Sequence, residues 1–94
     1  MDKDTILAIL SREKDNFNIK QFVLFGSFST DTSHSNSDID IAYILKDGSK
    51  MTFDGYLSLE QRLTNSLNAK VDLINFKKLN PLIRLNAEKN FIYV

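Results

Sequence analysis

Three segments of the chain are expected to be helices, two of them because hydrophobic residues recur at helical spacing. Apolar positions spaced three or four residues apart form one side of a helix, which then packs against a core. The first two are a helix from Asp4 or Thr5 with Ile6, Ile9 and Leu10 on its apolar side, and a helix over about residues 54–67 with Leu59, Leu63 and Leu67. A third helix is expected to begin at Pro81, which suits a first turn, and to stop at Asn90 in a left-handed conformation.

Four shorter runs have the composition of β-strands. They are rich in β-branched and aromatic residues and are bounded by polar or turn-forming residues. The runs cover residues 19–25, 41–45, 70–75 and 91–94. Helices and strands alternate along the chain, and a short helix after Gly26 and Ser27 would bring the helices to about four. The pattern therefore predicts an α/β (α+β) fold with a mixed sheet of about four strands packed by about four helices.

Gly26 and Ser27 follow the first strand-like run and have the composition of a phosphate-binding turn. Glycine has no Cβ, so it permits a tight exit from a strand and lets backbone N–H groups approach an anion closely. Serine can cap a following helix and donate a hydrogen bond to a phosphate oxygen. Gly26 and Ser27 are the candidate nucleotide-binding residues, and a simple turn with a helix cap is the alternative.

Two aspartates, Asp38 and Asp40, stand at the start of the next strand-like region. Because side chains alternate along a strand, both carboxylates should point to one face of the sheet. Asp72 lies in the run at residues 70–75 and would join them if the two strands were neighbours. Close carboxylates repel unless a cation lies between them, and their hard oxygen atoms suit Mg²⁺.

Asp38, Asp40 and Asp72 are therefore the candidate metal ligands and catalytic residues. Two Mg²⁺ ions about 4 Å apart, with Mn²⁺ as a substitute, would stabilise an in-line displacement at phosphorus. Asp72 is the candidate general base for the attacking hydroxyl. For Asp38 and Asp40 taken alone, a solvated pair of surface aspartates is the alternative.

The spacing of these motifs resembles that of the minimal nucleotidyltransferases of the DNA polymerase β superfamily. The resemblance is carried by Gly26-Ser27, ten intervening residues, Asp38-Ile39-Asp40 and the later Val71-Asp72-Leu73. It extends to Asn80-Pro81-Leu82-Ile83-Arg84 and to Asn90-Phe91-Ile92-Tyr93-Val94, which are similar to the family's closing helix and last strand. The resemblance covers nearly the whole chain and implies one small polymerase-β-like nucleotidyltransferase domain at residues 1–94.

The resemblance also implies a function. Members of this family are commonly antitoxins, and some transfer AMP from ATP, with Mg²⁺, to a tyrosine of a HEPN-domain ribonuclease toxin. One alternative is a degenerate transferase that neutralises its partner by binding alone. Another is a small-molecule transferase similar to those that adenylylate aminoglycosides, but these generally add a helical acceptor-binding domain, for which a chain of this length leaves little room.

One segment departs from the family's pattern. Many relatives carry a small residue, an arginine and a glycine shortly after the Gly-Ser pair, whereas this chain has Ser29, Thr30 and Asp31. An arginine would donate charge-assisted hydrogen bonds to a phosphate, and an aspartate near a triphosphate is electrostatically unfavourable. We therefore expect an altered affinity for the triphosphate or an altered choice of donor.

Composition narrows the partners and the location. The 94 residues include twelve basic and twelve acidic side chains, so the chain lacks the excess positive charge that drives nonspecific DNA binding. No stable nucleic-acid complex is expected. The chain has no cysteine, no apolar run near the roughly twenty residues of a membrane span, and a polar N-terminus, which together favour a cytoplasmic protein that is not attached to a membrane.

Overall fold

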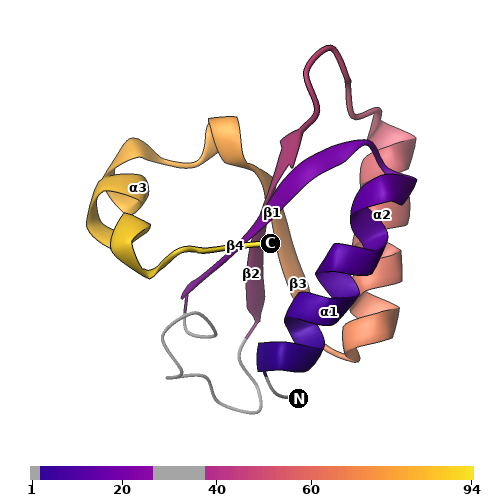
Figure 1. Cartoon of the computed structure of the whole chain (residues 1–94), viewed down its shortest axis with the longest axis horizontal. Coiled ribbons are helices and arrows are strands. Elements are labelled where there is room, and N and C mark those ends of the chain that lie inside the picture. Colours follow the sequence, from indigo (N-terminus) through magenta and orange to yellow (C-terminus); the bar gives the residue numbers. More distant parts are fainter. Residues whose placement is uncertain (1–2, 27–37) are drawn as a thin grey trace.

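The computed structural model describes residues 3–26 and 38–94, which are shown in Figure 1. In chain order, its elements are α1 (Lys3–Glu13), the 3₁₀ turn η1 (Lys14–Asn16), β1 (Ile19–Phe25), β2 (Ile39–Leu45), α2 (Phe53–Leu67), β3 (Val71–Asn75), the 3₁₀ turn η3 (Phe76–Lys78), α3 (Pro81–Ala87), the 3₁₀ turn η4 (Glu88–Asn90) and β4 (Ile92–Tyr93). The four predicted strands and three of the predicted helices are confirmed. The short helix expected after Gly26 and Ser27 falls outside the described residues.

The four strands form one mixed sheet in the order β3-β2-β1-β4. β1 pairs antiparallel with both β2 and β4, whereas β2 and β3 are parallel and are connected through α2. A parallel pair needs such a crossover because the chain must return to the same end of the sheet. As a result, the end of β1 and the starts of β2 and β3 lie together. We call this the carboxylate end of the sheet.

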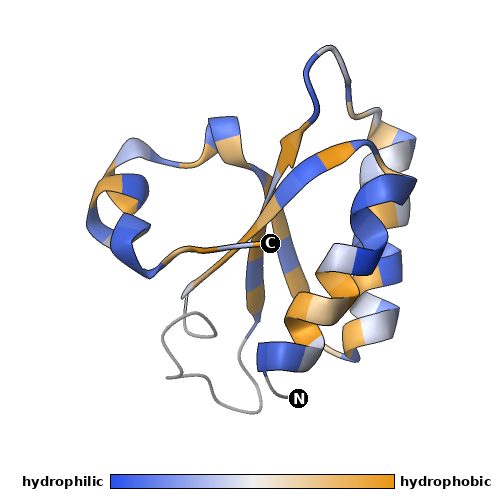
Figure 2. Cartoon of the chain, in the orientation of Figure 1, coloured by the Kyte–Doolittle hydropathy of each residue, from blue (hydrophilic) through white to orange (hydrophobic). Residues whose placement is uncertain are grey.

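Side chains alternate between the two faces of the sheet, and each face has its own hydrophobic cluster. On the first face, α1 and α2 contribute to a cluster of Ile6, Leu10, Ile19, Phe22, Leu24, Ile39, Ile41, Tyr43, Leu59, Leu63, Leu67, Val71 and Leu73. On the second face, Val23 and Ala42 pack with Leu79 and Phe91 from the C-terminal segment. Figure 1 accordingly shows α1 and α2 on one side of the sheet and α3 on the other, and Figure 2 shows the strands as mainly hydrophobic.

Helix ends differ from the expectation at two places. α1 already begins at Lys3, so Asp4 and Thr5 lie in its first turn rather than at its cap. The left-handed stop predicted at Asn90 is wrong, because α3 passes into the 3₁₀ turn η4 instead. Asn68 is the left-handed residue that ends a helix, with a φ of 50° at the end of α2. Within the described ranges, no helix is both long and apolar enough to cross a membrane.

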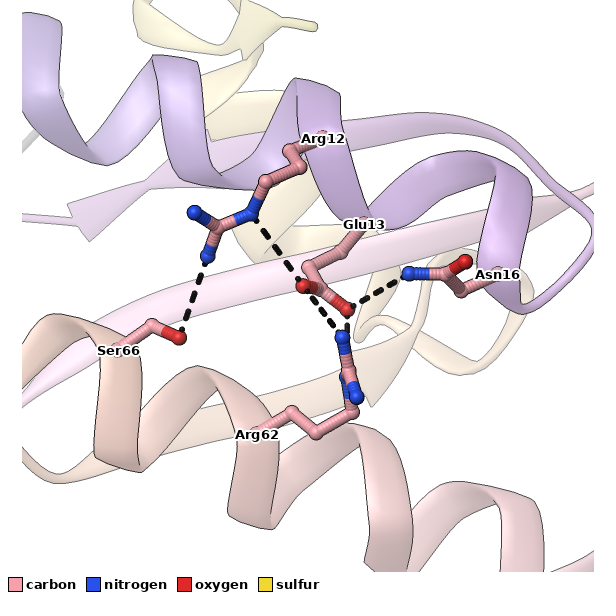
Figure 3. Close-up of polar contacts among 5 residues, drawn as sticks. All are labelled: Arg12, Glu13, Asn16, Arg62 and Ser66. Carbon is pink, nitrogen blue, oxygen red and sulfur yellow. Dashed lines mark hydrogen bonds and ion pairs between the residues drawn. The ribbon is translucent and has the colours of Figure 1, made fainter.

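A buried carboxylate joins the two helices that cover the first face (Figure 3). Glu13 is 1% exposed and accepts hydrogen bonds from Nε and Nη2 of Arg62 at 2.7 and 3.0 Å. Asn16 donates to it at 3.4 Å, and Nε of Arg12 lies 3.6 Å from Glu13 Oε1. The hydrogen bond from Arg62 is the main reason that the pKa of Glu13 lies below its usual range. Glu13 is therefore ionised at neutral pH and links α1 to α2.

Candidate active site

Parallel pairing of β2 with β3 brings Asp40 and Asp72 together. The register pairs Ile39 with Val71 and Asp40 with Asp72. Neighbouring strands are about 4.8 Å apart, so the two aspartates stand side by side on the same face of the sheet. That face is the second one, because the residues on either side of Asp40 belong to the cluster of the first face. The expectation that the strand of Asp72 neighbours that of Asp40 is confirmed.

Asp38 lies just before β2, next to a lysine. Nζ of Lys70 is 3.8 Å from Oδ2 of Asp38, and the Asp38 side chain is 45% exposed. Lys70 precedes β3 and accepts a 2.9 Å hydrogen bond from the N–H of Ile39, which fixes the two chain segments beside each other. An exposed ion pair of this kind contributes little to stability. It does place a positive charge beside Asp38, and the sequence motifs do not identify Lys70.

Asp40 is partly buried and lies close to two other aspartates. Burial raises the pKa of Asp40, and the charges of Asp72 and Asp38 raise it further. In the described part of the chain, no three His, Cys, Asp or Glu side chains form a group that could hold a metal ion as they stand. The donor set nevertheless fits Mg²⁺, which usually takes one or two carboxylates and completes its coordination with substrate phosphates and water.

Gly26 follows β1 and lies directly against Asp40. Its φ of +75° is in the region that side chains with a Cβ rarely adopt. A Cβ added there would overlap Oδ2 of Asp40 and lie 3.0 Å from its Cγ. Glycine is therefore required at this position both by backbone conformation and by space. Ser27, the other predicted nucleotide-binding residue, and the segment from Ser29 to Asp31 lie outside the described residues.

Tyr56 supports the strand that carries Asp72. Its hydroxyl, on α2, donates a 2.7 Å hydrogen bond to the carbonyl oxygen of Leu73, the next residue after Asp72. Among the described strands, β3 lies at the edge of the sheet and pairs with β2. Burial raises the pKa of Tyr56, which keeps the donor proton in place. This tyrosine therefore has a structural role at the edge of the candidate site.

Two cavities lie away from the aspartates. Their volumes are about 350 and 400 Å³, and both are lined by Asn75 at the far end of β3. Neither is lined by Gly26 or by the three aspartates. The candidate active site is thus not part of either of these two cavities; Asp38 and Asp72 are exposed, and Asp40 is partly buried.

Comparison with known proteins identifies the family. Residues 5–94 match the family model described as "Polymerase beta, Nucleotidyltransferase". MJ1379 of Methanocaldococcus jannaschii, provisionally named as a protein adenylyltransferase, is 37% identical over 82 residues, which are 86% of this chain and 82% of that protein. The protein adenylyltransferase MntA of Shewanella oneidensis is 34% identical over 86 residues, which are 88% of this chain and 57% of MntA.

Solved structures share the fold. A crystal structure of a toxin-antitoxin with AMP-PNP contains a chain that superposes with a TM-score of 0.71 at 25% identity, over 99% of this chain and 72% of that chain. A structure of the tri-AMPylated Shewanella oneidensis HEPN toxin in complex with MNT antitoxin gives a TM-score of 0.69 at 22% identity, over 99% and 71%. The expected fold, a small mixed sheet with helices, is confirmed. The chain belongs to the polymerase beta nucleotidyltransferase family.

Proposed function

We propose that this chain is an antitoxin that transfers AMP from ATP to a tyrosine hydroxyl of a HEPN-domain ribonuclease toxin. The observation that carries the proposal is the pairing of Asp40 with Asp72 next to Gly26. The name of MntA supports adenylyl transfer, and the toxin-antitoxin structures that share the fold support a toxin as acceptor. AMP-PNP in one of them supports ATP as the donor.

Asp38, Asp40 and Asp72 would hold two Mg²⁺ ions, with Mn²⁺ as a substitute, together with phosphate oxygens of ATP. When bound, these ions would neutralise the aspartates and polarise the phosphate that is attacked. The raised pKa of Asp40 supports this assignment, because a nearby cation removes the repulsion among the three carboxylates. Gly26 would let the backbone approach the phosphates, with Ser27 as a second contact.

Asp72 would act as the general base. The acceptor hydroxyl oxygen bonds to the α-phosphorus, the bond from that phosphorus to the pyrophosphate oxygen breaks, and the hydroxyl proton passes to the Asp72 carboxylate. Asp72 is exposed, so an acceptor on another protein can reach it. The exposure of Asp38 as well as Asp72 also favours a macromolecular acceptor.

A binding-only antitoxin is the second candidate. It is favoured by the absence, among the described residues, of a group of three side chains ready to hold a metal ion. The replacement of the family's arginine in the segment from Ser29 to Asp31 points the same way. Such a protein would neutralise its toxin without consuming ATP.

Labelled ATP, Mg²⁺ and the cognate HEPN toxin provide the test. Wild type should label the toxin, and Asp40→Asn and Asp72→Asn should each reduce the labelling rate by roughly a hundredfold or more. Asp54→Asn is the matched control, because Asp54 is an exposed acid in the first turn of α2, away from the site, and it should label at the wild-type rate. Toxin neutralised without labelling, by wild type and by Asp40→Asn alike, would replace the enzyme with the binding-only antitoxin.

A further inference from the structure

Helix α3 exposes three large aliphatic side chains. Leu82, Ile83 and Leu85 are 67%, 45% and 75% exposed, and we call them the α3 patch. Figure 2 shows hydrophobic residues on this helix, which projects from the second face of the sheet. Neighbouring exposed apolar side chains on a small protein commonly mark an interaction site. The α3 patch is thus a candidate surface for a partner.

The helix is fixed with this patch facing outward. Leu79 and Phe91, which flank the segment, are buried in the second-face cluster and anchor it to the sheet. The guanidinium of Arg84 stacks on the ring of Phe76, 4.7 Å from its centroid. Asn80 caps the first turn by accepting a 2.8 Å hydrogen bond from the N–H of Leu82. These contacts define the orientation of α3 without using the aliphatic side chains.

The segment that carries α3 also reaches the candidate active site. The ring of Phe91 packs edge-on against Phe25, with centroids 5.8 Å apart. Phe25 pairs with Asp40 across the β1–β2 ladder and directly precedes Gly26. A protein seated on α3 would therefore lie on the same face of the sheet as Asp40 and Asp72.

The charges of the segment that carries the patch indicate what kind of partner fits. Residues 76–94 carry four basic side chains, Lys77, Lys78, Arg84 and Lys89, and a single acidic one, Glu88. In a two-fold symmetric contact the same surface would face itself, so these like charges would oppose a dimer of this chain. A different protein with acidic residues around an apolar surface would be attracted to these basic side chains.

We propose that the α3 patch, together with the basic side chains of residues 76–94, is the docking surface for the acceptor protein of the transferase. That protein would present an apolar helix face flanked by Asp and Glu side chains. Docking there would hold its acceptor hydroxyl near Asp72. The inference rests on the proposed function for the identity of the acceptor, but docking and transfer can be measured separately.

The test measures how two double variants bind the cognate HEPN toxin. Leu82→Ser with Leu85→Ser removes the α3 patch, and Phe53→Ser with Leu57→Ser is the matched control on α2, where both residues are also exposed. The α3 variant should weaken toxin binding, measured by calorimetry, by about tenfold or more, since a few anchor residues carry most of an interface's binding energy. The α3 variant should raise the KM for the toxin by the same factor as it weakens toxin binding, and should leave the KM for ATP unchanged. The control should match wild type in all three quantities.

Four outcomes decide the matter. Weaker toxin binding by the α3 variant alone supports the docking surface, even where wild type shows no AMP transfer and the proposed chemistry fails. Toxin binding equal to that of wild type overturns it, even where transfer itself is intact. A loss confined to the α2 variant also overturns it. Light scattering that finds a wild-type dimer and a monomeric α3 variant would assign the patch to self-association and overturn the proposal.

Discussion

Replacing Asp40 with asparagine should stabilise the protein when metal and nucleotide are absent. Asp40 is partly buried and stands beside Asp72 on the neighbouring strand. Two unit charges about 5 Å apart repel by about 0.8 kcal/mol in water and about 3.3 kcal/mol at an effective dielectric constant of 20. Because Asp72 is exposed and screened by solvent, we expect a gain near the lower figure, about 1 kcal/mol.

The gain should depend on pH with a definite sign. Burial and the two neighbouring aspartates raise the pKa of Asp40 in the folded state. The protonated form therefore favours folding, and this contribution is complete below the unfolded pKa and is lost as pH rises through the folded pKa. Asparagine mimics the protonated form at every pH. The difference in stability between Asp40→Asn and wild type should grow from about pH 4, the ordinary value for aspartate, upward.

Thermal unfolding followed by circular dichroism, in chelator and at low salt, would measure this difference. For a domain of this size, 1 kcal/mol corresponds to roughly 4–8 °C in Tm. Asp47→Asn is the matched control, since it removes an exposed aspartate beyond the opposite end of β2 and should show no such trend. Adding Mg²⁺ and ATP should raise the Tm of wild type and of the control but not of Asp40→Asn. A variant that is no more stable than wild type at any pH would refute the electrostatic reasoning.

Two further substitutions test the contact that joins α1 to α2 and the glycine beside Asp40. Glu13→Ala should lower the free energy of unfolding at neutral pH by roughly 1.5–3 kcal/mol, the net contribution of a hydrogen bond to a charged group. Since the pKa of Glu13 is lowered on folding, this contribution is present above the unfolded pKa and is lost as pH falls through the folded pKa. In urea titrations, the difference in unfolding free energy between wild type and Glu13→Ala should therefore shrink in acid. A difference that stays constant with pH would contradict this reasoning. Gly26→Ala should abolish the thermal response to Mg²⁺ and ATP by displacing Asp40, whereas Gly48→Ala, with a φ of +80° but open space around its Cβ, should lose stability only. Equal responses in the two glycine variants would assign the effect to backbone strain.

Local sequence patterns predict most of the helices and strands, because each of them is strongly favoured by residues close together in the sequence. The bounds of β1 agree with the apolar run at residues 19–25, and Leu59, Leu63 and Leu67 are buried as their helical spacing predicts. The left-handed stop at Asn90 failed because the conformation of a helix end depends on where the next residue packs. Here Phe91 is drawn into the second-face cluster, and its N–H bonds to Glu88 through a 3₁₀ turn.

Local sequence patterns predict less of the candidate site. Alternation predicts Asp38 and Asp40 on one face, but whether Asp72 joins them depends on which strands are neighbours, and the register of β2 with β3 establishes this for Asp40. Glu13 and Arg62 are 49 positions apart in the sequence, and their contact arises from the packing of α1 on α2. No sequence motif therefore predicts it. Lys70 is likewise identified only by the parallel pairing that sets it beside Asp38.

The two faces of the sheet separate the larger hydrophobic cluster from the candidate site. The first face holds the larger buried cluster, and the contact of Glu13 with Arg62 ties together the two helices that cover it. The second face combines repelling aspartates with a short helix whose aliphatic side chains are exposed, and both features are unfavourable for an isolated chain. A fold stabilised mainly through its first face can tolerate both. Because Asp40→Asn removes the repulsion among the aspartates, it is expected to strengthen the fold while removing the response to metal and nucleotide.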